Sequence, residues 1–220
     1  MSAGGRGRPV VGAAARDGWR GTPALKGGRS LSRRAEAVGR DHPLRRFFDE
    51  MVARRFDADL RLPDSRLAAY VSGLLVDFTH VDSLYRIRDA RGRRLEDVGE
   101  MLLESNPLLG ASSFDRERAV RKHVGDYVLF MTGLFPESLS GRPRFGQMRL
   151  DAFVDYVKAG KESYGVVAAF DQFEYREEAP FFRKLADNFE LCVFGLNLVK
   201  EDLERLQRTY YRGLREALGG

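Results

Sequence analysis

Apolar residues recur every three or four positions along most of the chain after residue 40, which is the spacing of one face of an α-helix. The densest apolar run is Tyr127–Pro136, which is entered through His123, Gly125 and Asp126. Around this run the apolar positions cover most of the helix circumference rather than a single stripe. A helix of that kind belongs in the middle of a bundle, so the pattern predicts a central helix that stops at Pro136.

The remaining pattern predicts an all-α domain with a single core and six or seven helices. The expected helices cover residues 41–56, 64–78 with a continuation to 85, 95–105, 112–135, 150–175 and 180–199, followed by an amphipathic stretch at 203–214. Asp41, Asp64 and Ser112 each stand where a helix-capping side chain is expected. No run alternates apolar and polar residues between hairpin turns, which argues against β-strands.

The first 40 residues have a different character from the rest of the chain. Residues 1–40 are rich in Gly, Arg, Ala and Ser and show no hydrophobic period, so they are predicted to be a disordered basic tail before a domain at 41–220. Residues 1–46 hold 11 Lys and Arg against 3 acidic residues, whereas the rest holds 26 basic and 29 acidic residues. The basic tail therefore accounts for the pI of 9.5, and the folded part is slightly acidic.

Composition narrows the function classes further. Of the 220 residues, 43% are hydrophobic and 31% are charged, a balance typical of a soluble domain with a sizeable core. No run approaches the ~20 apolar residues that a membrane-spanning helix needs. The one cysteine, Cys192, lies among apolar residues and is expected to be a buried thiol in a reducing, cytoplasmic setting. Serine-hydrolase elbows and phosphate-binding loops are absent from the sequence, which disfavours those enzymes.

Two pairs of ionisable residues are the strongest candidates for chemistry. Asp77 and His80 are spaced i, i+3, as are His123 and Asp126, so each pair can share one helix face. Facing helices that carry carboxylate and imidazole groups are how helical bundles hold two iron or two manganese ions. These four residues therefore form a candidate metal site.

Glu100 and Glu104, one helical turn apart, could add oxygen ligands to this site. The usual bundle motif is Glu-x-x-His, however, and here both pairs use the shorter Asp and one pair is reversed. A second hypothesis makes His80 or His123 an axial haem ligand against a wall of aromatic residues. The alternative to both is structural: His and Asp pair with each other or with Tyr to satisfy polar groups at the edge of the core.

Five arginines form the densest basic cluster of the domain, in the turn predicted around Gly92. They are Arg86, Arg88, Arg91, Arg93 and Arg94. Such a cluster could contact an anion or an acidic partner, or it could be a solvated connection between helices. The longest irregular insert of the domain is predicted at 136–149, and it is either a functional loop or a slack connection.

Three stretches carry a resemblance to other proteins. They are Leu84-Tyr-Arg-Ile-Arg with Gly92-Arg-Arg-Leu, the run from Gly125 to Pro136, and Tyr156 with Gly160-Lys-Glu-Ser-Tyr164. Over about residues 43–200 the chain resembles conserved hypothetical proteins of bacteria that are all helical. The resemblance implies a bacterial, cytoplasmic protein and brings no activity with it.

Because no catalytic motif is present, the sequence favours a helical binding or regulatory module that acts through contacts with a protein partner or with further copies of itself. One alternative is a metal- or haem-dependent bundle enzyme that uses Asp77, His80, His123 and Asp126. Another is association with nucleic acid through the basic tail, although the tail's one aromatic residue, Trp19, provides no stacking platform. Two further interpretations of the tail are that it serves only solubility, or that it results from a start codon assigned upstream of the true one.

Overall fold

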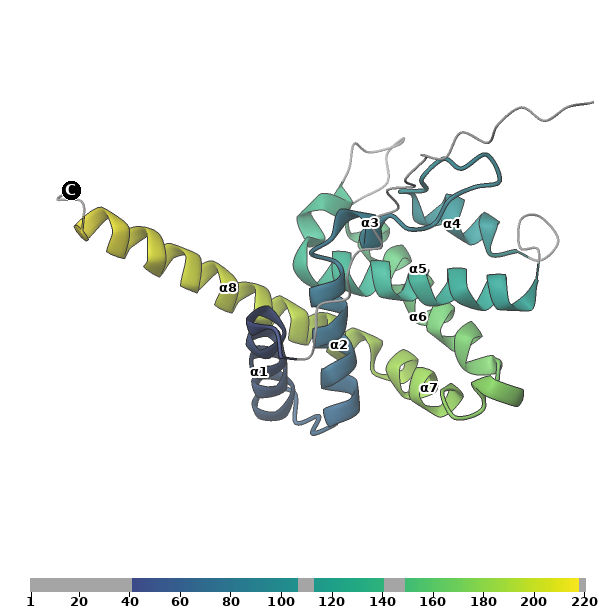
Figure 1. Ribbon diagram of the computed structural model, residues 1–220, viewed down its shortest axis with the longest axis horizontal. Coiled ribbons are helices and arrows are strands. Elements are labelled where there is room, and N and C mark those ends of the chain that lie inside the picture. The colour runs from purple at the N-terminus through teal and green to yellow at the C-terminus, as the bar shows by residue number, and fades with distance from the viewer. Residues whose placement is uncertain (1–40, 107–112, 141–148, 218–220) are drawn as a thin grey trace, which may run out of the picture. The chain divides into compact units, whose positions relative to one another are not determined.

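The structure is a computed structural model that describes residues 41–106, 113–140 and 149–217. In these ranges the chain forms eight α-helices and two 3₁₀ helices, with no strand beyond an isolated bridge between Arg88 and Arg94 (Figure 1). The α-helices are α1 (Pro43–Ala58), α2 (Ser65–Asp77), α3 (Val81–Leu84), α4 (Val98–Glu104), α5 (Phe114–Leu134), α6 (Arg149–Ala169), α7 (Ala179–Asp187) and α8 (Phe189–Ala217). The 3₁₀ helices are η1 (Pro136–Ser140) and η2 (Phe173–Tyr175). The prediction of an all-α domain is confirmed.

The helix α5 lies at the centre of the fold, as its sequence predicts (Figure 1). It packs against α2, α4, α6 and α8, and Val120, Val124 and Val128 on it are fully buried. Two glycines let neighbouring helices come close to it. A Cβ on Gly160 of α6 would stand 2.8 Å from Cγ1 of Val128, and a Cβ on Gly133 would stand 2.5 Å from Leu196 of α8. The core therefore depends on small residues at helix crossings as well as on large apolar ones.

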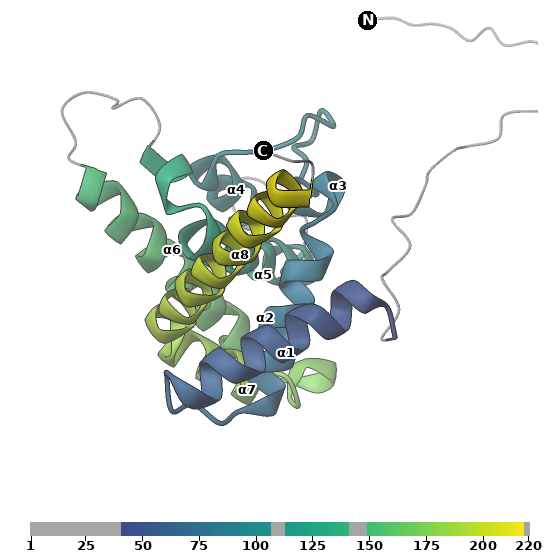
Figure 2. The ribbon, with the colours of Figure 1, turned by 90° about the vertical axis from the view of Figure 1, so that its left-hand side faces the viewer.

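The helix α1 packs against α2 and against the middle of α8, an arrangement visible from two directions in Figures 1 and 2. The turn between α1 and α2 ends at Asp64, whose Oδ1 accepts hydrogen bonds from the backbone N–H groups of Arg66 at 2.9 Å and Leu67 at 3.0 Å. This confirms Asp64 as the predicted cap. The first cap was predicted one residue too early, because Nδ1 of His42, not Asp41, accepts from Leu44 N at 3.2 Å.

Several helix ends differ from the prediction for local reasons. The second helix stops at Asp77 rather than continuing to 85, because Thr79 turns back and its hydroxyl donates to the carbonyl of Val76 at 2.6 Å. The cap of α5 is Ser113, whose Oγ accepts from Arg116 N at 3.1 Å. The predicted cap Ser112 lies outside the described residues, as do residues 1–40 and 141–148.

After residue 149 the predicted boundaries between helices are wrong. The helix α6 ends at Ala169 instead of near 175, and η2 follows it. The helix expected at 180–199 breaks at Asn188, where the side-chain amide donates to the carbonyl of Lys184 at 2.8 Å and closes α7. From Phe189 a single helix of 29 residues then runs on to Ala217 and includes the stretch predicted at 203–214. None of the described helices combines the length and the apolar character needed to cross a membrane.

Candidate functional site

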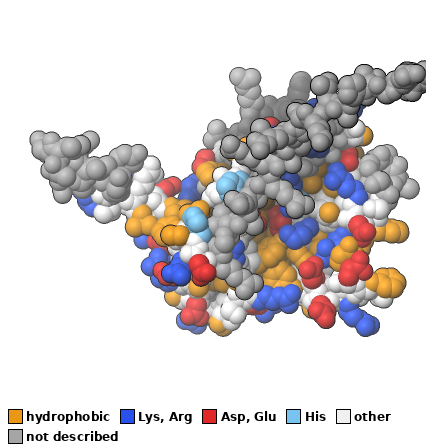
Figure 3. Space-filling view, in the orientation of Figure 1, with side chains coloured by type: hydrophobic (Ala, Val, Ile, Leu, Met, Phe, Trp, Pro, Cys, Tyr) orange, Lys and Arg blue, Asp and Glu red, His pale blue; other side chains and the backbone are white. Residues whose placement is uncertain are grey.

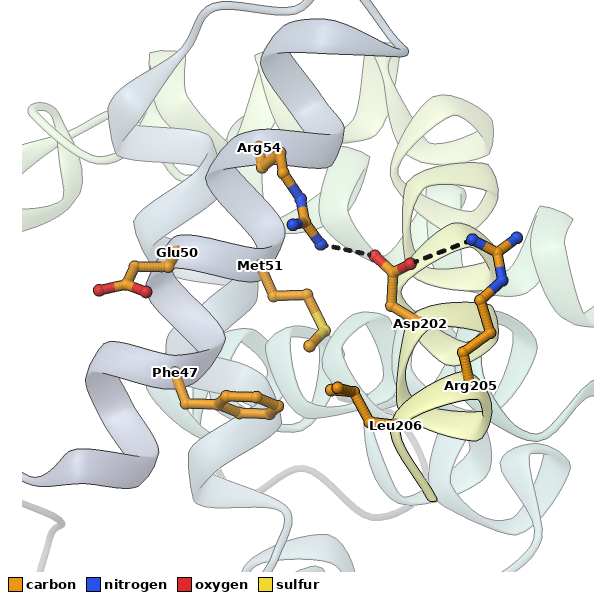
Figure 4. A pocket seen from close by; sticks show the side chains of 7 residues that line it. All are labelled: Phe47, Glu50, Met51, Arg54, Asp202, Arg205 and Leu206. Carbon is orange, nitrogen blue, oxygen red and sulfur yellow. Dashed lines mark hydrogen bonds and ion pairs between the residues drawn. The ribbon is translucent and has the colours of Figure 1, made fainter. Parts of the chain in front are cut away.

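A groove lined by apolar and charged residues lies between α1 and α8, two helices from opposite ends of the described chain. Phe47 and Met51 reach into it from α1 and Leu206 reaches into it from α8, so the three side chains face one another across the gap (Figure 4). The hollow has a volume of about 430 Å³. Met51 is buried at its floor, whereas Phe47 is 38% exposed and Leu206 is 51% exposed. The groove therefore leaves apolar surface in water between two helices.

Charged groups close one end of this groove around Asp202 of α8. Its carboxylate accepts hydrogen bonds from Arg55 Nε at 2.8 Å, from Arg55 Nη2 at 2.6 Å and from Arg54 Nη2 at 3.0 Å. Arg205 Nη1 lies 3.7 Å from it (Figure 4). The hydrogen bonds from Arg55 are the main reason why the pKa of Asp202 is lowered. One carboxylate thus holds α1 against α8 with three guanidinium groups around it.

The approach of α1 to α8 depends on Gly195. A Cβ at this position would lie 2.5 Å from Cε2 of Phe56 and 2.9 Å from Cδ1 of Leu60, distances that no real methyl group could keep. Gly195 lies N-terminal to Asp202 on α8, whereas Leu206 lies C-terminal to it and faces Phe47 (Figure 4). The groove therefore lies on the C-terminal side of this close contact along α8.

A second carboxylate, Asp126 of α5, is buried instead of lying at an edge. Its Oδ1 accepts from the hydroxyl of Tyr70 on α2 at 2.5 Å and from that of Tyr164 on α6 at 2.8 Å. Its Oδ2 accepts from Lys122 Nζ at 2.8 Å. Burial alone would raise the pKa of Asp126, but the charge of Lys122 and these hydrogen bonds lower it overall. Gly125 makes room for this cluster, since a Cβ there would stand 2.6 Å from the ring of Tyr164.

His123 lies on the same helix and has no solvent exposure. Its Nε2 is 3.1 Å from the carbonyl oxygen of Leu84, so the neutral ring with a proton on Nε2 donates to that carbonyl. Burial, followed by the charge of Arg86, lowers the pKa of His123 to about 4. The ring is therefore neutral at neutral pH, and it packs edge-on against Phe78 at 5.9 Å between centroids.

The four predicted metal ligands are not brought together. Asp77 and His80 are exposed, whereas His123 and Asp126 are buried and already have hydrogen-bond partners. Nowhere in residues 41–106, 113–140 and 149–217 do three His, Cys, Asp or Glu side chains form a group that could hold a metal ion. Asp126 instead pairs with tyrosines, which is the structural alternative described above.

The two glutamates predicted as further ligands are held by arginines. Glu100 accepts from Arg93 Nη2 at 3.2 Å, and Glu104 accepts from Arg116 Nη2 at 3.2 Å. Cys192 is buried and burial raises the pKa of its thiol to about 12, so the prediction of a buried thiol is confirmed.

The arginine cluster forms an exposed turn between α3 and α4. Arg93 pairs with Asp89 at 3.2 Å as well as with Glu100, and Arg94 pairs with Asp82. Arg88 donates to the carbonyl of Gly92, which has a φ of +80° that only glycine adopts without strain. Arg86 and Arg91 are also exposed. The turn is thus a solvated connection in which part of the basic charge is already neutralised.

The sequence does not indicate the groove. Its apolar period predicts helices at 41–56 and 203–214, which contain Phe47, Met51 and Leu206, but it does not say that these two segments face each other. The available signal is that apolar positions at helical spacing continue past Val199, the last fully buried side chain among those described in α8. Comparisons with protein-family models, with curated proteins and with solved structures found no match to this chain.

Proposed function

We propose that this protein is a helical binding module that acts through protein contacts, and that its α1–α8 groove docks the C-terminal part of α8 from a second copy of the chain. The observation that carries the proposal is the groove itself, an apolar hollow with Phe47 and Leu206 partly in water. Amphipathic helices bind to other proteins by laying an apolar stripe into a groove of this kind.

The same chain also carries a helix suited to that groove. Beyond Val199, the apolar positions Leu203, Leu206, Tyr210 and Leu214 keep helical spacing along α8. Figure 1 shows this part of α8 projecting past α1. The last 15 residues of the helix measure about 22 Å, enough for about two heptads of contact. Because Leu206 both lines the groove and belongs to this series of positions, a two-fold pairing can bring the groove and the helix end into a single interface.

Charge supports a second copy as the occupant. Glu50 lies at the rim of the groove and is exposed, and Asp57 is exposed further along the same helix. The end of α8 is basic, with Arg208 and Arg212 both exposed. When the helix end of one copy lies along α1 of the other, these arginines can approach Glu50, while Arg54 and Arg205 at the groove stay paired with Asp202.

The experiment is to measure the molar mass of the full chain in solution by size-exclusion chromatography with light scattering across a range of concentrations. We expect twice the chain mass at high concentration. Leu206→Glu places a charge in the groove and should give a monomer. Gln207→Glu adds the same charge at a neighbouring exposed position and should leave the dimer intact. Phe47→Glu tests the groove from α1 and should act like Leu206→Glu.

A wild-type chain that stays monomeric at every concentration would refute the second copy as occupant. Equal effects of Leu206→Glu and Gln207→Glu would show that charge, not the groove, controls association. The cytoplasmic setting and the bacterial origin stay predictions, supported by the buried thiol of Cys192 and by the sequence resemblance. The haem hypothesis and the nucleic-acid hypothesis also stay predictions, and the basic tail on which the second depends lies outside the described residues.

A further inference from the structure

A second hollow, of about 480 Å³, lies where α5 begins and α6 ends. Four aromatic side chains line it: Phe114 of α5, Phe170 after α6, and Phe173 and Tyr175 of η2. In the space-filling view, exposed hydrophobic side chains lie among acidic and basic ones at the right-hand end, around the start of α5 (Figure 3). This hollow, which we call the end pocket, shares no residue with the α1–α8 groove.

The end pocket is acidic. Asp115, Asp171 and Glu174 line it, and none of its described lining residues is Lys or Arg. The helix α6 also ends here, at Ala169, with no basic residue in its last turn. The C-terminal end of a helix carries a partial negative charge, which adds to the field of the carboxylates. The pocket therefore favours a cationic group and disfavours phosphate or nucleic acid.

The inner wall of the pocket already shows how a guanidinium group is bound here. The guanidinium of Arg118 lies 4.0 Å from the ring centroid of Tyr175 and donates to Glu178 at 2.6 Å. Tyr175 is held in place because its hydroxyl donates to Asp115 Oδ1 at 2.7 Å. One aromatic face and one carboxylate thus bind one arginine of the chain itself.

The outer wall repeats these groups without a cation among the described residues. Phe114 is 73% exposed and Phe173 is 91% exposed. Asp171 Oδ1 accepts a hydrogen bond from Gln172 Nε2 at 2.9 Å, and neither Asp171 nor Glu174 forms an ion pair with a described Lys or Arg. Phe173 also has a φ of +50°, a left-handed conformation that a phenylalanine adopts at a cost. Its exposed ring contributes nothing to the core that would offset this cost. A bound partner would cover these exposed rings and so offset the cost of the Phe173 backbone conformation.

We propose that the end pocket binds an arginine side chain presented by a basic, partly apolar segment of a partner protein. The guanidinium would stack on Phe173 or Phe114 while Asp171 and Glu174 accept its hydrogen bonds, as Tyr175 and Glu178 do for Arg118. Apolar neighbours of that arginine would cover the remaining aromatic surface. The inference goes beyond the proposed self-association, because it concerns a separate site and a different partner.

The test titrates the full chain into a fluorescently labelled probe peptide, acetyl-Leu-Arg-Leu-Arg-amide, and follows anisotropy at two salt concentrations. We expect binding that weakens as salt rises. The same peptide with Lys in place of Arg should bind more weakly, because an ammonium does not stack on a ring as a guanidinium does. The peptide with Glu in place of Arg should not bind.

Two variants place the binding in the end pocket. Glu174→Lys should lower the affinity by about tenfold or more, because it reverses the charge beside the cation. Glu162→Lys makes the same change of charge at an exposed position of α6 outside the pocket, and it should leave the affinity within about twofold. Both positions are exposed, so neither variant threatens folding.

A third variant separates binding from structure. Phe173→Gly removes the ring and relieves the backbone strain, so it should weaken peptide binding while the protein melts at the same or a higher temperature. The proposal is overturned if the arginine peptide does not bind at millimolar concentration, if the glutamate peptide binds equally well, or if Glu162→Lys matches the effect of Glu174→Lys. The molar mass of each variant is measured as well. A variant that loses peptide binding but still forms the dimer shows that the end pocket and the α1–α8 groove act independently, so either proposal can fail without the other.

Discussion

The two carboxylates Asp126 and Asp202 hold the fold together in different ways. Asp126 joins α5 to α2 and α6 through the hydroxyls of Tyr70 and Tyr164, with Lys122 as its counter-ion. Asp202 joins α8 to α1 through arginines. Each carboxylate connects helices that are far apart in the sequence. The surroundings differ: the side chain of Tyr164 is fully buried, whereas that of Arg54 is 64% exposed.

This difference separates a structural cluster from a binding surface. Around Asp126 both carboxylate oxygens have hydrogen-bond partners, so the cluster stabilises one arrangement of helices. Around Asp202 the guanidinium groups stand at the rim of an apolar groove and can still meet new partners. Buried polar groups that satisfy one another are poor candidates for recognition, and partly exposed ones beside apolar surface are good candidates.

The largest expected effect comes from removing the buried carboxylate. Asp126→Ala leaves the ammonium of Lys122 and two tyrosine hydroxyls without their acceptor, and it should lower the free energy of unfolding by about 3–5 kcal/mol. Urea denaturation followed by circular dichroism measures this. As a control, Tyr70→Phe removes one donor and should cost about 1 kcal/mol. A loss below 1 kcal/mol in Asp126→Ala would contradict the role given to this cluster.

The buried histidine should make stability depend on pH. The pKa of His123 is lowered from 6.5 to about 4, so the unfolded chain binds a proton that the folded chain excludes. Stability is therefore complete above pH 6.5 and falls as the pH drops towards 4, by up to about 3 kcal/mol. Denaturation of wild type and His123→Gln at several pH values measures the difference. If the free energy of unfolding of wild type and of His123→Gln depends on pH in the same way, the ring is not buried in its neutral form.

A smaller effect is expected at the groove. Asp202→Asn keeps the shape but removes the charge that Arg54 and Arg55 pair with, and it should cost about 1–2 kcal/mol because part of the pair is in water. Since the pKa of Asp202 is lowered, its contribution is present at neutral pH and is lost in acid as the carboxylate is protonated. Stability measured at pH 7 and at pH 3 checks both parts. If Asp202→Asn lowers the free energy of unfolding as much as Asp126→Ala does, the buried cluster is no more important for stability than the partly exposed one.

The smallest effect should come from the exposed arginine of the same cluster. Arg54→Ala removes an ion pair whose cation is mostly in water, and Arg55 continues to hold Asp202, so the change should stay below about 0.5 kcal/mol. Thermal denaturation measures it against Arg55→Ala, whose side chain is 17% exposed and which should cost more. If Arg54→Ala and Arg55→Ala lower the stability equally, the solvent exposure of the arginine does not determine the strength of its ion pair with Asp202.

Most of the fold could be predicted from the sequence because a helix leaves a local pattern of apolar residues and capping residues. The period of apolar residues placed α5 in the centre, and the spacing of Asp64 before an apolar run identified the cap of α2. The ends that were missed depend on single side chains. Thr79 and Asn188 each bond back to a carbonyl of the preceding turn, and such competition between side chain and backbone leaves no periodic signal.

The candidate site depended far more on tertiary structure. Sequence spacing correctly indicated that His123 and Asp126 share a helix, but spacing alone does not say which face of a helix is buried. The structure exposes Asp77 and His80 and buries the other pair, so four residues that looked alike in the sequence have different surroundings. The groove is a stronger example, because Arg54 and Asp202 are 148 positions apart in the chain.

The sequence by itself determined the fold class, the central helix and the slightly acidic character of the domain, because these follow from local period and composition. Only the tertiary structure decided where helices cross, which polar groups are buried and where apolar surface stays uncovered. Those outcomes depend on the packing of distant residues, such as Gly195 against Phe56, where the absence of a side chain on Gly195 lets α8 approach α1 closely. The α1–α8 groove and the proposed partner follow from that crossing.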